Sequence, residues 1–159
     1  MLLIAPFSRP LHNGLPNPKN FPYWKEVISK LKGQVIQVGG GGEPQLVEDF
    51  RTGLSLDDLG KLVDTCDTWL SVDTFFQHFC WDRKKPGIVI WSCSDPLIYG
   101  HPENINLLKD RSYLTDNQFM MWENVPFAEE RFVNAQTVLH HVAIMAPQHA
   151  HLELQGPDF

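Results

Sequence analysis

Three polar stretches of the sequence carry residue types that could bind a charged ligand. They run from Ser8 to Lys19, from Gly39 to Glu43 and from Asp73 to His78, and each follows a short apolar run. In open parallel sheets, ligands bind beyond the carboxyl ends of the strands, which meet at one edge of the sheet. We therefore expect the three stretches to converge on one rim.

The chemistry of these stretches suits a phosphate group. The glycine run 39–42 permits close approach of the backbone to a ligand. The turn at Asp73-Thr74 places unpaired N–H groups at a helix start, where a phosphate binds with little help from side chains. Lys19 and Arg9 supply cations that could neutralise it. Together these features predict a nucleotide pocket in which the positive charge is only local.

Each feature also has a plainer interpretation, which the sequence leaves open. The four glycines could form a flexible turn, and Asp73 could cap a helix on which His78 faces the core. The sequence contains neither GxxxxGK[ST] nor GxGxxG. It therefore predicts neither a P-loop nor the dinucleotide-binding fingerprint.

The elements that must position these residues alternate between strands and helices over the first 90 residues. Short apolar runs predict buried strands, and apolar residues spaced three and four apart predict helices. The predicted strands cover 2–5, 34–38, 69–72 and 88–91, and the predicted helices cover 23–31, a segment capped by Ser55, and 73–82. Such alternation predicts an α/β fold: a Rossmann-like, mostly parallel sheet with helices on both faces.

The pattern weakens after residue 91. Residues 92–106 are predicted to form a polar loop and 105–108 an edge strand, whereas 109–126 show no clear period. A long helix is predicted over 127–145, ended by Pro147. Residues 1–146 are thus predicted to form a single domain, and residues 147–159 a flexible tail without a core-facing pattern.

Length and charge exclude several classes of protein. The chain has 159 residues, which is one domain's worth, and 13 Lys and Arg against 19 Asp and Glu leave a net charge of −6. A nonspecific nucleic-acid or anionic-membrane binder needs a basic field, so neither class is predicted. No signal peptide or membrane span is visible.

Three cysteines, with no metal-ligand spacing, predict reduced and buried thiols, and hence a cytoplasmic protein.

An ordered series of motifs resembles a known family more specifically than any single motif does. The series is Ser8-Arg9, Lys19-Asn20-Phe21-Pro22-Tyr23-Trp24, Val38-Gly39-Gly40 with Glu43, Gly53-Leu54-Ser55-Leu56, Asp73-Thr74-Phe75-Phe76-Gln77-His78, Lys85-Pro86 and Ser94-Asp95-Pro96. It resembles the C-terminal half of bacterial glycosyltransferases of the heptosyltransferase family, the lipopolysaccharide enzymes that use ADP-heptose. The resemblance covers about residues 2–100.

The resemblance implies one lobe of a two-lobed (GT-B) transferase that binds a nucleotide-diphosphate sugar as its donor ligand. It implies no metal and no separate cofactor. Carried over by position, the binding residues are Ser8, Arg9 and Lys19 facing the diphosphate, Glu43 near the nucleoside after Gly39 and Gly40, and Asp73, Thr74 and His78 around the phosphate and sugar.

Two departures from the family pattern bear on activity. Phe75 stands where the family usually has Gly, and its side chain could hinder the approach of a phosphate. In the family the catalytic base belongs to an N-terminal lobe, whereas this chain begins at the strand that opens the C-terminal lobe. Catalytic residues are therefore not assigned, with Asp73 and His78 as weak candidates.

The sequence thus predicts a glycosyltransferase-like protein for hexosyl or heptosyl transfer, with the missing lobe supplied by a partner subunit or by self-association. The alternatives are a noncatalytic nucleotide-binding or sequestering module, the small subunit of a two-chain assembly, and a degenerate fold that serves only as a contact surface.

Other residue clusters have plainer interpretations. The histidines His140, His141, His149 and His151 could bind a metal adventitiously, but no dedicated zinc pattern accompanies them. Residues 119–122 are predicted to pack in the core, with an exposed contact patch as the alternative. Residues 81–85 are expected to be a solvated helix end, with cations near the helix carboxyl terminus.

Overall fold

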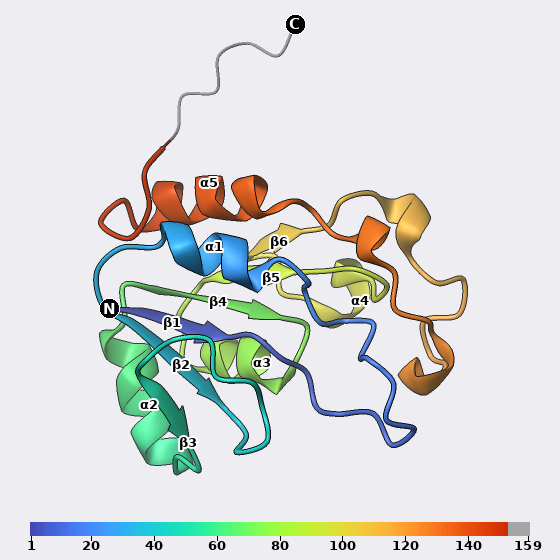
Figure 1. Ribbon diagram of the computed structural model, residues 1–159, viewed down its shortest axis with the longest axis horizontal. Coiled ribbons are helices and arrows are strands. Elements are labelled where there is room, and N and C mark those ends of the chain that lie inside the picture. The colour runs from blue at the N-terminus through green and yellow to red at the C-terminus, as the bar shows by residue number, and fades with distance from the viewer. Residues whose placement is uncertain (153–159) are drawn as a thin grey trace, which may run out of the picture.

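A six-stranded sheet, parallel throughout, forms the centre of the protein. The computed structural model describes residues 1–152 and confirms the α/β, Rossmann-like fold class (Figure 1). The strand order is β3-β2-β1-β4-β5-β6. The strands are β1 (Leu2–Ala5), β2 (Val35–Gly39), β3 (Phe50–Thr52), β4 (Thr68–Val72), β5 (Ile88–Ile90) and β6 (Ile105–Leu107).

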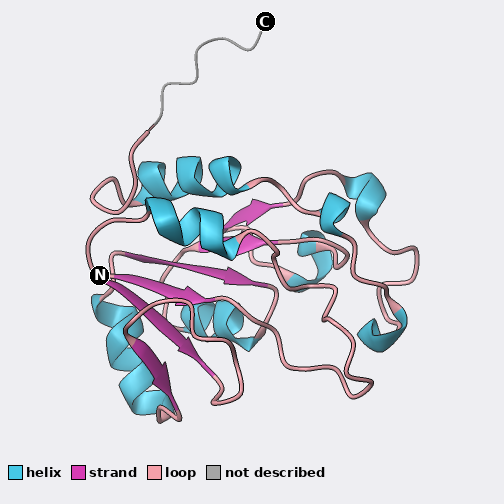
Figure 2. Cartoon of the chain, viewed as in Figure 1, coloured by secondary structure: helices cyan, strands magenta, loops and turns pink. Residues whose placement is uncertain are grey.

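Helices cover both faces of the sheet (Figure 2). They are α1 (Trp24–Lys30), α2 (Leu56–Thr65), α3 (Phe75–Asp82), α4 (Pro96–Tyr99) and α5 (Ala135–Met145), and short 3₁₀ helices occupy Arg111–Tyr113, Trp122–Asn124 and Glu129–Arg131. The helix α2 begins where predicted, because the Ser55 hydroxyl accepts a hydrogen bond from the Asp58 N–H at 3.1 Å.

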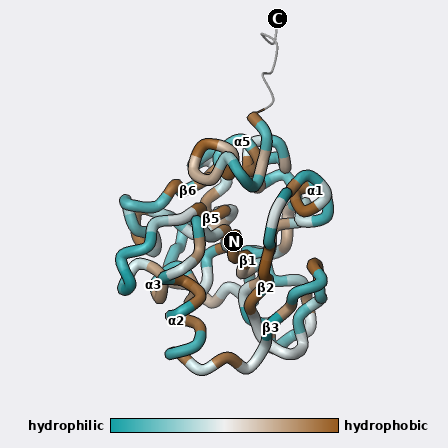
Figure 3. The backbone as a smooth tube through the Cα atoms, turned by 90° about the vertical axis from the view of Figure 1, so that its left-hand side faces the viewer, coloured by the Kyte–Doolittle hydropathy of each residue, from teal (hydrophilic) through white to brown (hydrophobic). Residues whose placement is uncertain are grey.

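The alternation of side chains along each strand divides the core between the two faces. In β1, Leu2 and Ile4 pack with the helices α1 and α5, whereas Leu3 and Ala5 pack with α2 and α3. Every residue of β1, β4 and β5 is buried, as expected for parallel strands covered on both sides. Figure 3 shows the strands lying between α1 and α5 on one side and α2 and α3 on the other.

The structure corrects several predicted boundaries. The strand β3 was not predicted, because three residues that stay at least partly exposed carry no readable period. The predicted loop 92–106 contains α4, which Asp95 caps and Pro96 begins. The predicted helix 127–145 begins only at Ala135, because the Asn134 side chain accepts the Thr137 N–H and fixes the N-cap there. The edge strand predicted at 105–108 is confirmed as β6.

The first residues of the predicted tail pack against the domain. His149 and Ala150 are each 2% exposed. The His149 Nδ1 donates to the Lys32 carbonyl at 2.8 Å, and its Nε2 lies 2.7 Å from Asp67 Oδ2. Residues 147–150 are therefore held to the ends of α1 and β4, and residues 153–159 lie outside the described part of the chain.

The three cysteines, Cys66, Cys80 and Cys93, are buried and unpaired. Burial raises the pKa of each thiol, so the thiolate that would react is disfavoured.

Among residues 1–152, no helix has the length and apolar composition that crossing a membrane requires.

The contact between Asp67 and the C-terminal segment predicts an acid-sensitive contribution to stability. The Met1 ammonium and the His149 imidazole hold the pKa of Asp67 well below its usual range. A carboxylate with a lowered pKa stabilises the fold above its ordinary pKa and loses that effect as the pH falls through the folded value. Since the Asp67 side chain is 35% exposed, we expect Asp67→Asn to cost only about 1 kcal/mol at pH 7.

Urea unfolding between pH 7 and pH 2 measures this contribution. The difference between the wild-type protein and Asp67→Asn should persist down to about pH 4 and then shrink. The matched control is Asp116→Asn, at an exposed carboxylate with no ion pair among residues 1–152. A difference that is constant over the whole pH range would contradict the prediction.

Candidate functional site

The strand order places a topological switch point between β1 and β4. The chain leaves β1 through α1 toward β2 and leaves β4 through α3 toward β5, on the opposite face and in the opposite direction (Figure 1). The two connections therefore diverge at the carboxyl ends of these strands. In doubly wound sheets, ligands bind in the crevice that such a divergence forms.

Asp73, the first residue after β4, organises the switch point. Its Oδ2 accepts a hydrogen bond from the Ser94 hydroxyl at 2.7 Å and pairs with Lys19 Nζ at 3.0 Å. Its Oδ1 accepts from Gln77 Nε2 at 2.7 Å. The Ser8 hydroxyl donates to the Asp73 backbone carbonyl at 2.7 Å. The connections after β1, β4 and β5 thus meet at one carboxylate.

Lys19 is held on two sides. Its side chain is 15% exposed, its ammonium pairs with Asp73, and the same nitrogen lies 4.4 Å from the centroid of the Trp122 ring. An ammonium has three donors. It can therefore keep the Asp73 contact and still donate toward the crevice, although the carboxylate offsets part of its charge.

The first turn of α3 has no side-chain cap. The N-cap residue is Thr74, but its hydroxyl accepts no backbone hydrogen bond, and Asp73 is directed into the Lys19 network instead. The structure therefore contradicts the alternative interpretation in which Asp73 caps this helix. The first N–H groups of α3 are left without that partner beside Lys19, which is where an anion is favoured.

The loop after β2 forms a separate part of the same edge. The Glu43 N–H donates to the Gly40 carbonyl at 3.2 Å, and the Glu43 carboxylate folds back over Gly39. A Cβ at Gly39 would lie 2.0 Å from Glu43 Oε2, so this approach requires glycine. The Glu43 Oε2 is buried without a hydrogen-bond partner, and burial raises the pKa of the carboxyl.

Other predicted site residues lie apart from Asp73. His78 is exposed, and its Nδ1 lies 2.8 Å from Nε2 of His101. Burial and the neighbouring His78 lower the pKa of His101. Arg9 is exposed, and its side chain contacts no acceptor among residues 1–152. The structure therefore brings Ser8, Lys19, Asp73 and Thr74 together, places Gly39, Gly40 and Glu43 on the same edge, and separates His78 from them.

The sequence prediction assigned no site role to three residues that contribute to the site. Ser94 follows β5 at the same edge as Asp73, so its position after a buried strand is a signal that could have found it. Gln77 lies four residues after Asp73, one helical turn along α3, and is fully buried. Trp122 lies in a segment without period, and no sequence signal predicted its contact with Lys19.

Comparisons with known proteins give no relative. No protein-family model matches the chain, and neither the curated proteins nor the solved structures contain a significant match to it.

The buried pair of Lys19 and Asp73 predicts strong energetic coupling. Removing either partner leaves the other charge poorly solvated, so we expect Asp73→Ala and Lys19→Met each to lower the free energy of unfolding by about 2–3 kcal/mol. In the double variant neither charge is left buried without its partner. The decrease in its free energy of unfolding should be about 1–2 kcal/mol smaller than the sum of the decreases in the single variants. Urea unfolding of the four proteins measures the coupling.

The exposed pair of Lys61 and Asp58 is the matched control. These side chains are 79% and 61% exposed with 3.9 Å between Nζ and Oδ1. The same double-variant cycle there should show coupling below about 0.5 kcal/mol. Equal coupling in the two cycles would mean that the Asp73 network does not hold the switch point together.

Proposed function

We propose that this domain binds a nucleotide-diphosphate sugar in the crevice between β1 and β4, as the donor-binding lobe of a glycosyltransferase. The observation that carries the proposal is the meeting of Lys19, Ser8 and the uncapped start of α3 at the topological switch point. A lysine ammonium acts as a compact cation for phosphate, and unpaired amides at a helix start add donors.

The proposed ligand would extend along the edge of the sheet. The diphosphate lies at Lys19 and the first turn of α3, with Arg9 free to approach it from the loop after β1. The nucleoside lies toward Glu43, whose carboxylate lies over Gly39 at this edge of the sheet. During transfer, negative charge grows on the departing diphosphate, and these cations and amides would stabilise it.

Phe75 does not block this arrangement. It is the first residue of α3 and is 60% exposed, and its ring centroid lies 5.8 Å from that of Phe79. Side chains on a helix lean toward its N-terminus, so the Phe79 ring packs back against Phe75. In the proposed arrangement the Phe75 ring stays against Phe79 and leaves the first-turn amides open to the ligand.

The acceptor side of the reaction belongs, in this proposal, to a second lobe. Residues 1–152 form one sheet with one switch point, and the imidazole of His78 is paired with His101.

The second candidate function is a noncatalytic nucleotide-binding module. The observation that favours it is the pairing of Lys19 with Asp73, since a cation that is already partly neutralised binds phosphate without activating it strongly.

Calorimetry with ADP-, UDP- and GDP-sugars tests the proposed binding. We expect one of the series to bind, and Lys19→Met to weaken that ligand about tenfold, the loss of one charge-assisted contact worth about 1.4 kcal/mol. The control is Lys25→Met, which removes an exposed cation from α1. Binding of none of these ligands to the folded wild-type protein would overturn the proposal.

Turnover separates the two candidate functions. Release of free sugar, which is transfer of the sugar to water, would support a transferase lobe, and chromatography of the bound donor measures it. Light scattering would show whether self-association accompanies this release. Binding by a monomer without turnover would support the noncatalytic module.

A further inference from the structure

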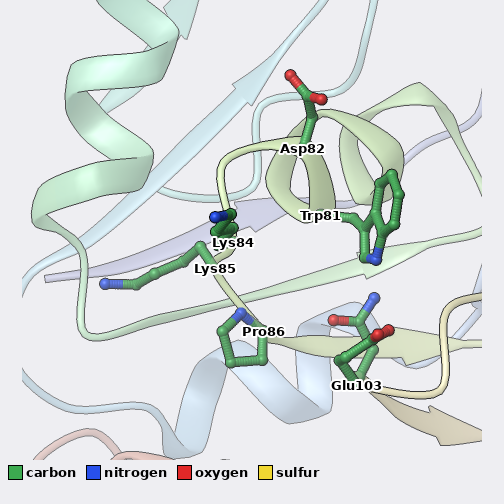
Figure 4. A pocket seen from close by; sticks show the side chains of 7 residues that line it. Trp81, Asp82, Lys84, Lys85, Pro86 and Glu103 are labelled. Carbon is green, nitrogen blue, oxygen red and sulfur yellow. The ribbon is translucent and has the colours of Figure 1, made fainter.

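A second pocket lies at the opposite edge of the sheet. It has a volume of about 540 Å³, and its walls are Trp81, Asp82, Lys84, Lys85, Pro86, Glu103 and Asn104 (Figure 4). Pro86 comes shortly before β5, and Asn104 comes directly before β6. Because all strands are parallel, these residues lie at the amino ends of the strands, away from the Asp73 network.

One wall of this pocket contains a buried donor without a partner. Asn104 is 7% exposed, and its Oδ1 accepts a hydrogen bond from the Gly87 N–H at 3.1 Å. This contact fixes the orientation of the amide, because only the oxygen can accept. The Nδ2 is then left with no hydrogen-bond partner. Buried polar groups are seldom unpaired, so this atom calls for an acceptor.

Trp81 gives the pocket an aromatic wall. The indole is 47% exposed, and one of its faces stacks on His101 with a centroid distance of 4.6 Å and an interplanar angle of 10°. His101 is not among the lining residues. The stacked face therefore points out of the pocket. The contact with His101 holds the indole in place at the wall of the cavity. A rigid, half-exposed indole is a platform for a planar ring.

Lys84 is held in an unusual backbone conformation at this site. It is the only residue other than glycine with a positive φ, 58°, among residues 1–152. The Lys84 N–H donates to the Trp81 carbonyl and the Lys85 N–H to the Cys80 carbonyl, both at 2.9 Å, which ends α3 in a Schellman motif. Glycine is favoured at this position of the motif. The backbone of Lys84 is therefore strained, and backbone strain of this kind is retained at functional sites.

The charged side chains around the pocket are two carboxylates, Asp82 and Glu103, and two ammonium groups, Lys84 and Lys85. Arg83-Lys84-Lys85 is the longest basic run in an acidic chain. Arg83 pairs with Asp64, whereas the ammonium groups of Lys84 and Lys85 form no ion pair within the described part of the chain. Figure 4 shows the Lys85 ammonium extending away from Trp81. Lys84 is therefore the cation available to a ligand that lies against the indole.

From this arrangement we propose that the pocket binds a nucleoside monophosphate. The base stacks on Trp81, the Asn104 amide donates to an acceptor on the base edge, and the Glu103 carboxylate accepts from a base amino group. The phosphate pairs with Lys84. A base with a phosphate supplies the planar face, the mixed donors and acceptors, and the negative charge that these side chains require.

Indole N–H signals in a ¹H–¹⁵N spectrum of the full chain report on this site directly. The signal that disappears in Trp81→Phe identifies Trp81. The indole N–H groups of Trp24, Trp69 and Trp91 are hydrogen-bonded inside the protein and serve as internal references. Titration with AMP and GMP should shift the Trp81 signal, and Trp81→Ala should weaken binding about tenfold or more, as loss of one stacking contact does.

Lys84 and a lysine outside the pocket make a matched pair of variants. Lys84→Gly removes the cation and relieves the positive φ, so we expect it to raise the unfolding temperature while weakening AMP binding about tenfold. Lys25→Met removes an exposed cation from α1, which does not line the pocket, and should change binding less than twofold. Adenosine, which lacks the phosphate, should bind wild type and Lys84→Gly equally.

The result that would overturn the proposal is an unshifted Trp81 signal at millimolar AMP and GMP, or equal weakening by Lys84→Gly and Lys25→Met. Lys19→Met, at the other edge of the sheet, should leave the Trp81 response unchanged. Failure of this second site is therefore distinguishable from failure of nucleotide-sugar binding at the switch point.

Discussion

The buried carboxylate of Asp73 is the constraint on which the switch point depends. A carboxylate that is 6% exposed must have its acceptor capacity filled, and here a serine, a glutamine and a lysine from three different segments fill it. The lysine comes from a loop of 18 residues between β1 and α1 that has no regular structure. The carboxylate thus fixes one end of that loop against the sheet.

The loop after β1 is held by more than this pair. The Asn17 amide donates to the Arg9 carbonyl at 2.9 Å, the Ser92 hydroxyl donates to the Pro18 carbonyl at 2.8 Å, and the Asn20 side chain accepts the Ser8 N–H at 2.8 Å. Five prolines in the segment limit the freedom of its unfolded chain. A long loop can therefore present Lys19 at a defined position, as a binding loop on a rigid scaffold must.

The sequence predicted the fold better than it predicted the site. Buried parallel strands such as 88–91 are readable because their apolar runs are bounded by Pro-Gly and a polar turn, and the N-cap of α2 is readable from Ser55 and Asp58. The start of α5 was misplaced because Phe127 and Phe132 continue an apolar pattern through a segment that is not helical. Local patterns record which face of an element is buried, and they record its ends less well.

The sequence predicted only those contacts of the site that follow from the order of the strands in the sheet. Ser8, Lys19 and Asp73 follow strands that become neighbours, so their meeting follows from the parallel order of the sheet. The contact of Trp122 with Lys19 spans about 100 residues and arises from an irregular segment that Gln118 anchors to Asp95 and Cys93. His78 lies apart from Asp73 for a different reason. A helix turns by about 100° per residue, and it is Gln77, four residues on, that faces back to Asp73.

The two edges of the sheet obtain their polar groups by different routes. At the carboxyl edge, Lys19 and Asp73 meet through the tertiary fold, so a substitution there changes the stability of the fold as well as the side chains at the switch point. At the amino edge, Trp81 and Lys84 belong to one helix terminus whose Schellman motif is local, and Glu103 and Asn104 come from the segment before β6. The amino edge can therefore change its side chains at little cost to the fold. That a strained lysine persists there, where glycine would be more stable, argues for a function at this edge that does not depend on the other.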